Sequence, residues 1–256
     1  MTKLLLLGNS FSDDMAMYMP EIAMEYNIDI DVHILGYPGC SIDQHLDFIT
    51  NNKNVYVHRT YDFINKKWLF EYNVKPVEII NKEKWDYIFI QQCSSLSGES
   101  DSISNVDELI ALVRDNLLSK DSKFVWHMTW PYPSFNEFAI FNNDFKRNPE
   151  AMYQGILDNV QKHIVNNKNI SLIIPNGTAV MNLKLEQSER DIYRDPVHLS
   201  FHFGRFMASL VAMKKLFNLD YRNLIYRPFS MMDNNQKVCV DACNLAIEKP
   251  FEVTKK

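Results

Sequence analysis

The feature that most constrains the fold is the short apolar run Leu4–Leu7, which ends in Gly8-Asn9-Ser10. Four apolar residues are too few for a buried helix and are typical of a β-strand that is covered on both faces. Ligands of open α/β sheets bind beyond the carboxyl ends of such central strands. The sequence therefore places Ser10 at the edge of a sheet where a ligand site is expected.

A helix is expected from Met15 to Tyr26, directly after this turn. Its first backbone N–H groups would point toward Ser10, and they favour nearby negative charge, including the oxyanion of an attacked ester. The alternative interpretation is purely structural, with Gly8-Asn9-Ser10 as a strand-to-helix turn whose serine caps the helix. The turn by itself favours this second interpretation.

Strand-like and helix-like segments alternate along the rest of the chain, which predicts a parallel, doubly wound sheet. Strand patterns occupy residues 28–35, 85–90, 123–128 and 170–174, and helical patterns occupy residues 42–50, 77–81, 106–118, 149–165, 201–219 and 233–247. Residues 54–73 depart from this order, because extended, aromatic-rich segments flank a polar turn and predict a β-hairpin insertion. Residues 225–256 are expected to form a peripheral C-terminal extension with one helix.

The chain has 256 residues, 46% of them hydrophobic, which predicts a single domain over residues 1–256. Its net charge is −5 and no basic cluster occurs, so nucleic acid is not an expected partner. No stretch approaches the roughly 20 apolar residues of a membrane span, and the first residues lack the pattern of a signal peptide. The protein is therefore expected in the cytoplasm, without membrane contact.

Cys239 and Cys243 are four residues apart, as are His198 and His202, and either spacing could hold a metal ion. No second Cys/His pair accompanies the cysteines, and no metal is expected. Cys40, Cys93, Cys239 and Cys243 are interpreted as small core residues. His33 lies on the polar phase of its strand and is expected to face solvent, and surface positions are also expected for three further histidines, His45, His58 and His163. His127 and the aromatic-rich loop that follows it either line a pocket or pack against the sheet.

A second motif, Asp195-Pro196-Val197-His198, precedes the helical pattern at residues 201–219. An aspartate three residues before a histidine can accept a hydrogen bond from one imidazole nitrogen and leave the other nitrogen basic. A serine nucleophile needs such a base. The alternative is a surface loop with a charged pair, which the motif alone favours.

Together, the two motifs resemble those of the SGNH (GDSL-type) hydrolase superfamily, and most closely the branch known as domain of unknown function 4886. The resemblance extends over nearly the whole chain. The segments that carry it are Gly8–Ser12, Gly39, Trp85–Gln91, Trp126–Trp130, Asp195–Ser200 and Gly204-Arg205.

The resemblance implies a three-layer α/β/α sandwich with a flavodoxin-like, five-stranded parallel sheet. It also implies that Ser10 is the nucleophile, that His198 is the general base and then the acid, and that Asp195 orients His198. The Ser10 and Gly39 N–H groups and one side-chain amide would hold the oxyanion. No cofactor is implied.

The third block of the family pattern differs in this chain. Members of the wider superfamily have Gly-x-Asn-Asp there, and its asparagine donates to the oxyanion, whereas this chain has Gln91-Gln92. A glutamine amide can make the same hydrogen bond from a longer side chain. The alignment favours Gln91, with Gln92 as the alternative, because neighbouring strand residues point to opposite faces.

The resemblance leads us to expect a serine esterase that hydrolyses a small acyl ester through an acyl-enzyme on Ser10. Family analogy favours an O-acetyl group on a carbohydrate, so a small-molecule or carbohydrate ester is the expected partner. Two alternatives remain open. One is an acyltransferase that uses the same site, and the other is a non-catalytic binding protein that retains the fold.

Overall fold

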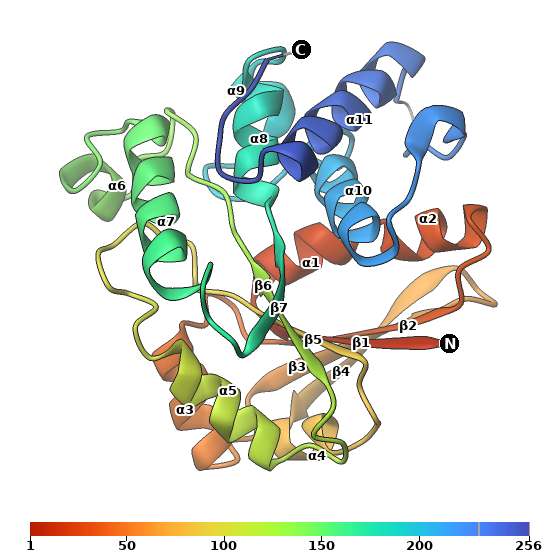
Figure 1. Ribbon diagram of the computed structural model, residues 1–256, viewed down its shortest axis with the longest axis vertical. Helices are drawn as coiled ribbons and strands as arrows, with labels where there is room; N and C mark the ends of the chain where they lie inside the picture. The colour runs from red at the N-terminus through yellow and green to blue at the C-terminus, as the bar shows by residue number, and fades with distance from the viewer. Residues whose placement is uncertain (230, 256) are drawn as a thin grey trace.

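The structure, a computed structural model, describes residues 1–229 and 231–255, apart from the side chain of Ile140. A seven-stranded sheet has helices on both faces (Figure 1). The strands are β1 (Thr2–Gly8), β2 (Ile30–Gly36), β3 (Tyr56–Asp62), β4 (Lys67–Val74), β5 (Tyr87–Ile90), β6 (Lys123–His127) and β7 (Ile170–Ile174). The helices are α1 (Ser10–Ala16), α2 (Met19–Glu25), α3 (Ile42–Thr50), α4 (Pro76–Ile80), α5 (Val106–Asp115), α6 (Ala139–Asn143), α7 (Pro149–His163), α8 (Asn176–Lys184), α9 (Glu189–Ile192), α10 (Gly204–Phe217) and α11 (Asp233–Glu248), with a 3₁₀ turn η1 (Tyr221–Asn223).

Five strands form the predicted parallel sheet in the order β2-β1-β5-β6-β7, which is the flavodoxin-like order. The chain leaves β1 toward β2 on one side and later returns to place β5 on the other side. The carboxyl ends of β1 and β5 therefore form a switch point, where open α/β sheets bind ligands. Ser10 follows β1 and Gln91 follows β5, so both residues lie at this point.

The predicted hairpin consists of β3 and β4, and it is part of the main sheet. Strand β3 pairs antiparallel with β2, and β4 pairs antiparallel with β3, which extends the parallel sheet to seven strands. The sequence did not predict this extension, since nothing in the hairpin pattern shows which strand it pairs with. Strand β4 is an exposed edge of the sheet.

The apolar run in β1 serves both cores of the protein. Leu4 and Leu6 pack in one hydrophobic cluster, while Leu5 and Leu7 pack in the other, and all four side chains are at most 1% exposed. Side chains alternate between the faces of a strand, and burial of each leucine contributes about 1.5–3 kcal/mol. Helices α1, α2, α8, α10 and α11 cover the first face, and α3, α4, α5 and α7 cover the second.

The helices at the two ends of the chain differ from the prediction. The first helix begins at Ser10 rather than at Met15, and it ends before a separate helix α2 that has Pro20 in its first turn. Helix α11 packs against α8 and α10 and buries Cys239 and Cys243, so the C-terminal extension is not peripheral. Residues 230 and 256 of that extension lie outside the described residues. No helix among those described is long and apolar enough to cross a membrane.

Three histidines that were expected at the surface are buried. His45 hydrogen-bonds the Tyr56 hydroxyl through Nδ1 at 2.7 Å, and His33 Nδ1 lies 2.8 Å from His58 Nε2. His163 is partly exposed. The surface prediction was wrong for His33, His45 and His58, because a polar side chain can be buried when it has a hydrogen-bond partner. All four cysteines are buried, as predicted.

Helix α8 was not predicted, because Pro175-Asn176-Gly177 has the composition of a turn. Gly177 lies in the first turn of the helix, and its N–H donates to the Met128 carbonyl at 3.0 Å. A Cβ atom at Gly177 would overlap the Thr129 carbonyl oxygen. The glycine therefore lets the start of α8 approach the loop that follows β6.

We predict that Gly177→Ala lowers the free energy of unfolding by about 1–3 kcal/mol, since the backbone must move to accommodate the methyl group. Urea denaturation followed by circular dichroism measures this change. Ser171→Ala, at an exposed position of β7, is the control and should stay within about 0.5 kcal/mol of the wild type. Equal stabilities of the two variants would contradict the close approach at Gly177.

Candidate active site

Ser10 is the first residue of α1, and the side chain of Asn9 caps this helix. Asn9 Oδ1 accepts a hydrogen bond from the Phe11 N–H at 3.0 Å. The first N–H groups of a helix have no acceptor within the helix, so the Ser10 N–H remains available to a ligand. Ser10 is partly exposed, whereas Asn9 is 3% exposed. The turn thus presents the serine and buries the residue that shapes it.

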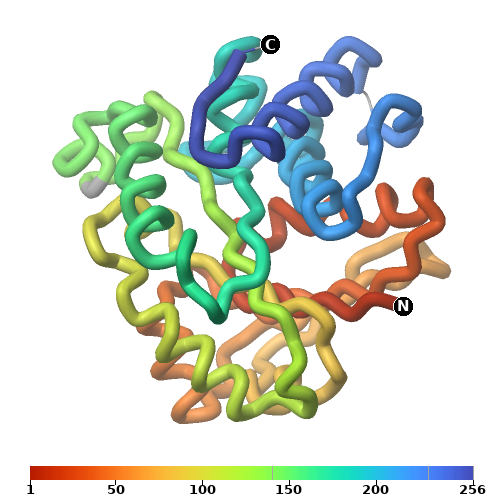
Figure 2. The backbone as a smooth tube through the Cα atoms, in the orientation of Figure 1, coloured from red at the N-terminus to blue at the C-terminus, as the bar shows by residue number. Residues whose placement is uncertain are grey.

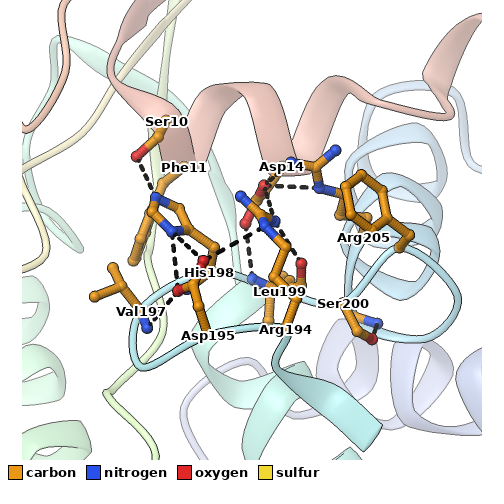
Figure 3. Close-up of polar contacts among 12 residues, drawn as sticks. Ser10, Phe11, Asp14, Arg194, Asp195, Val197, His198, Leu199, Ser200 and Arg205 are labelled. Atoms are coloured by element: carbon orange, nitrogen blue, oxygen red, sulfur yellow. Dashed lines mark hydrogen bonds and ion pairs between the residues drawn. The ribbon is translucent and has the colours of Figure 1, made fainter. Parts of the chain in front are cut away.

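The structure brings together the three predicted catalytic residues (Figure 3). His198 Nε2 lies 2.9 Å from Ser10 Oγ, and His198 Nδ1 lies 3.0 and 2.9 Å from the two carboxylate oxygens of Asp195. The Nδ1 contact to a carboxylate places a proton on Nδ1 and leaves the lone pair of Nε2 facing the serine hydroxyl. This arrangement is suited to removing the Ser10 proton during an attack.

Asp195 is held in its ionised form by its neighbours. Burial acts to raise the pKa of this carboxyl group, but hydrogen bonds from the His198 and Val197 backbone N–H groups and from the His198 ring outweigh burial. Its pKa is therefore lower than the ordinary value. The carboxylate shapes the loop as well as the ring, since it accepts from two backbone N–H groups of its own turn.

The lowered pKa of Asp195 predicts a pH-dependent contribution to stability. A carboxyl group with a lowered pKa in the folded state stabilises the protein above its unfolded pKa of about 3.9, and this contribution is lost as the pH falls further. We therefore expect Asp195→Asn to be less stable than the wild type at pH 7, with a difference that shrinks toward pH 3. Urea denaturation at pH 7, 5 and 3 measures it.

Glu137→Gln, a change at an exposed position, serves as the control for that series. Its stability difference from the wild type should stay small at all three pH values. A difference for Asp195→Asn that is the same at pH 7 and pH 3 would show that the carboxylate charge contributes nothing.

The buried carboxylate of Asp14 connects α1 to the loop that carries His198. Asp14 is fully buried, and its Oδ1 pairs with Arg194 Nη1 at 3.0 Å and with Arg205 Nη2 at 2.7 Å. Its Oδ2 accepts from the Leu199 N–H at 2.8 Å. Figure 3 shows Asp14 between the two arginines, one helical turn after Ser10. The residue after His198 is thereby fixed to the helix that begins with Ser10.

Asp14 was not among the site residues predicted from the sequence. The signal that points to it is an aspartate four residues after Ser10, on the same side of the helix, together with arginines on both sides of His198. Since the partners are about 180 residues away, no local spacing reveals the pairing.

We predict that Asp14→Asn lowers the free energy of unfolding by about 2–4 kcal/mol, because it leaves two arginines without their carboxylate in a buried site. Urea denaturation at pH 7 tests the prediction. Asp13→Asn is the matched control. Among the described residues Asp13 forms an ion pair with Arg59 alone, at 3.2 Å, so this substitution should cost about 1 kcal/mol or less. A smaller effect at Asp14 than at Asp13 would refute the anchoring role.

Aromatic residues support the same loop from the other side. The Phe11 and Trp130 rings are stacked with centroids 4.0 Å apart, and Phe11 also contacts the His198 ring edge-on. Trp130 Nε1 donates to the Val197 carbonyl at 3.1 Å. Trp130, Tyr132 and Phe141 are at most 2% exposed. These three residues of the aromatic-rich loop therefore pack against the core and do not form a ligand-facing wall.

Gly39 lies in an exposed turn beside the site. Its φ of +65° lies in the left-handed region, which favours glycine, and the Cys40 N–H closes the turn on the Tyr37 carbonyl at 3.1 Å. Asn9 Nδ2 donates to the Cys40 carbonyl at 3.1 Å. The Asn9 side chain thus fastens the Gly39 turn to the turn that carries Ser10.

Gln91 and Gln92 have partners inside the protein and are 1% and 2% exposed. Gln91 Nε2 donates to Asn9 Oδ1 at 2.7 Å, and Gln92 Nε2 donates to the Ser102 carbonyl at 2.6 Å. Neither amide is offered to a ligand in this arrangement, which corrects the prediction that one of them faces the oxyanion. Each instead holds a loop at the edge of the sheet.

The Gln91 contact is one link in a longer chain of hydrogen bonds. Asn176 Nδ2 contacts His127 Nε2 at 3.0 Å, and His127 Nδ1 contacts Gln91 Oε1 at 2.6 Å. The chain continues from Gln91 to Asn9 and from Asn9 to the Cys40 carbonyl. It follows the carboxyl ends of all five parallel strands. Of the two positions proposed for His127, the structure shows the hydrogen-bonded core position.

The described residues include no group of three or more His, Cys, Asp or Glu side chains placed to hold a metal ion.

The sheet order and the Ser10–His198–Asp195 arrangement define an SGNH-type α/β/α fold. Within that class, the chain belongs to the family described as Domain of unknown function (DUF4886), whose model matches residues 3–246. A DUF4886 family protein from Bacteroides uniformis is similar, with a TM-score of 0.91, 30% identity, and coverage of 99% of this chain and 97% of that chain.

Two further solved structures match with lower similarity. TesA gives a TM-score of 0.49 at 11% identity, covering 85% of this chain and 99% of that chain. A Clostridium thermocellum family 3 carbohydrate esterase gives a TM-score of 0.48 at 16% identity, covering 85% of this chain and 96% of that chain. The comparison with curated proteins gives no match.

Proposed function

We propose that the protein is a serine esterase that hydrolyses a small acyl ester through an acyl-enzyme on Ser10. The observation that carries this proposal is the continuous contact from Ser10 Oγ through His198 to Asp195, with each step between 2.9 and 3.0 Å. A serine with its base in reach, and a base oriented by a carboxylate, is the arrangement that nucleophilic acyl transfer requires.

In the first half of the reaction, His198 Nε2 takes the proton from Ser10 Oγ as this oxygen attacks the ester carbonyl carbon. The bond between the carbonyl carbon and the alcohol oxygen then breaks. His198 donates its proton to the leaving alkoxide, and the acyl group remains on Ser10. Asp195 stabilises the protonated ring and keeps Nε2 directed at the reacting oxygens.

In the second half, a water molecule attacks the acyl carbon with His198 again acting as the base. The bond to Ser10 Oγ breaks, and His198 returns the proton to the serine. The carboxylic acid leaves, and the site regains its starting state. The part of the triad that meets substrate is accessible, since Ser10 is partly exposed and the His198 side chain is 26% exposed.

The charge on the carbonyl oxygen requires donors that are already in place. We assign this role to the Ser10 N–H at the start of α1 and to the Gly39 N–H in the adjoining turn. The internal partners of Gln91 and Gln92 give these residues a supporting role, because they hold the turns that carry the two N–H groups.

We predict that Ser10→Ala lowers kcat for p-nitrophenyl acetate by a factor on the order of 10⁴ or more, since the nucleophile is lost. Release of p-nitrophenol measures the rate. Ser12→Ala is the matched control, because it removes the hydroxyl group of a buried serine in the same helix and leaves the nucleophile in place. Circular dichroism verifies that both variants are folded.

A fluorophosphonate probe provides a second measure of the nucleophile. It should label the wild type and Ser12→Ala, but not Ser10→Ala. Equal hydrolysis rates of the wild type and Ser10→Ala would remove Ser10 from the mechanism. Absence of both labelling and hydrolysis would indicate a non-catalytic binding protein with the same fold.

A further inference from the structure

A groove lies between α1 and the β-hairpin, beside the catalytic serine. It has a volume of about 480 Å³ and is lined by Asp13 and Met17 of α1, Ile34 of β2, Arg59 of β3, Trp68 and Phe70 of β4, and Arg205 of α10. Its volume is in the range of small-molecule sites. None of the catalytic residues lines it, so its composition needs a separate explanation.

The geometry of α1 places the groove next to Ser10, on the side away from the base. Successive residues of a helix are rotated by about 100° around its axis. Seen along that axis, Asp13 therefore lies to one side of Ser10 and Asp14 lies to the other. Asp14 contacts the His198 loop, whereas Asp13 faces the hairpin through Arg59. Met17 lies two turns from Ser10, about 10 Å along the axis. The groove therefore leads away from Ser10 along the side of α1 that faces the hairpin.

The hairpin contributes a row of aromatic side chains to this side. Trp68, Phe70 and Tyr72 alternate along β4 and share one face of the strand. Phe70 is 54% and Tyr72 is 68% exposed, and their rings stack with centroids 6.4 Å apart. Exposed aromatic residues grouped on one face mark a binding surface more often than scattered ones do. The row gives one wall of the groove an apolar, flat surface.

The lining beside this row is polar and carries charges of both signs, and the Arg59 guanidinium lies over the Phe70 ring, 5.7 Å from its centroid. Arg59 Nε lies 3.2 Å from Asp13 Oδ1, and Arg205 is paired with Asp14. Asp13 Oδ1 has no hydrogen-bond donor among the described residues, in spite of the nearby guanidinium. An anionic ligand would meet the Asp13 carboxylate, a cationic one would meet the Arg59 and Arg205 guanidinium groups, and an acyl chain would bury both ion pairs.

A ligand that matches both the aromatic row and the charged side chains beside it is neutral, has hydroxyl groups along one edge and has an apolar face. The C–H face of a pyranose or furanose ring meets the last condition, and its hydroxyl groups can donate to Asp13 Oδ1 and accept from Arg59. We propose that this groove binds the sugar that forms the alcohol part of the ester, with its ring on Trp68 and Phe70. This inference rests on the proposed esterase function and names its substrate class.

The first test compares kcat/KM for three sugar esters (6-O-acetylglucose, 6-O-acetylgalactose and 2-O-acetylxylose) with kcat/KM for p-nitrophenyl acetate. In Trp68→Ala, the ratio for the preferred sugar ester should fall at least tenfold, mainly through KM. Leu69→Ala is the matched control, because Leu69 is 43% exposed on the opposite face of the same strand. Its ratio should equal that of the wild type.

A ratio that is unchanged in Trp68→Ala for all three sugar esters would overturn the proposal. So would a loss confined to longer acyl chains, measured as the ratio for p-nitrophenyl octanoate to p-nitrophenyl acetate, because the groove would then hold the acyl group. Asp13→Asn gives a second variant, and it should lower the sugar-ester ratio without removing the aromatic surface.

The second test does not depend on catalysis. Trp68 is partly exposed, whereas Trp85, Trp126 and Trp130 are at most 3% exposed. Methyl glycosides of the three sugars should therefore change the tryptophan fluorescence of Ser10→Ala in a saturable way, and the change should disappear in Ser10→Ala/Trp68→Phe. Sugar binding without Ser10-dependent hydrolysis would refute the esterase and retain the sugar site. Ser10-dependent hydrolysis, with no effect of Trp68 on the sugar-ester ratio or on the fluorescence change, would retain the esterase and refute the sugar site.

Discussion

The buried pairing of Asp14 with Arg194 and Arg205 is the interaction on which the geometry of the site depends. Ser10 and His198 are 188 residues apart in the chain. Ser10 begins α1, and His198 lies in the loop before α10. A carboxylate without water needs compensating charge and hydrogen bonds, and Asp14 obtains both from the segment that carries His198. Figure 2 shows the N-terminal helices α1 and α2 beside α10. Because the buried Asp14 carboxylate needs charged partners, it holds the loop that carries His198 close to the helix that begins with Ser10.

A second constraint acts along the edge of the sheet. The hydrogen bonds from Asn176 through His127, Gln91 and Asn9 to Cys40 join the loops that follow β7, β6, β5, β1 and β2. His127, Gln91 and Asn9, in the middle of this series, each donate one hydrogen bond and accept another. At its end, Asn176 Oδ1 is buried and has no donor among the described residues. The turns that carry Ser10 and Gly39 are therefore held in register by side chains as well as by the strands beneath them.

The sequence predicted the parts of the site that depend on local geometry. The strand-turn-helix pattern around Ser10 and the three-residue spacing of Asp195 and His198 are both readable from neighbouring residues, and the alternation of elements predicted the parallel sheet. Resemblance to a known superfamily supplied the link between the two motifs. The β-hairpin was predicted, but its pairing with β2 was not, since strand partners are chosen by long-range contacts.

Long-range partners also explain the remaining errors. Asp14 was missed because its arginines are distant in sequence, and Gln91 was assigned to a ligand because its partners, Asn9 and His127, lie on other strands. His45 and His58 were placed at the surface because polarity suggests exposure when no partner is visible. In each case the residue type indicated a polar side chain, but its position in the fold depended on a hydrogen-bond partner that is distant in the sequence.

The burial of His127 determines the pH range over which the hydrogen bonds beside the site keep one arrangement. Burial lowers the pKa of this histidine to about 3, so the ring stays neutral from mildly acidic to alkaline solution. A neutral ring can donate from Nδ1 and accept at Nε2 at the same time, which fixes a single direction for the whole series of hydrogen bonds. The hydrogen-bonded framework beside Ser10 therefore keeps one protonation state over this pH range.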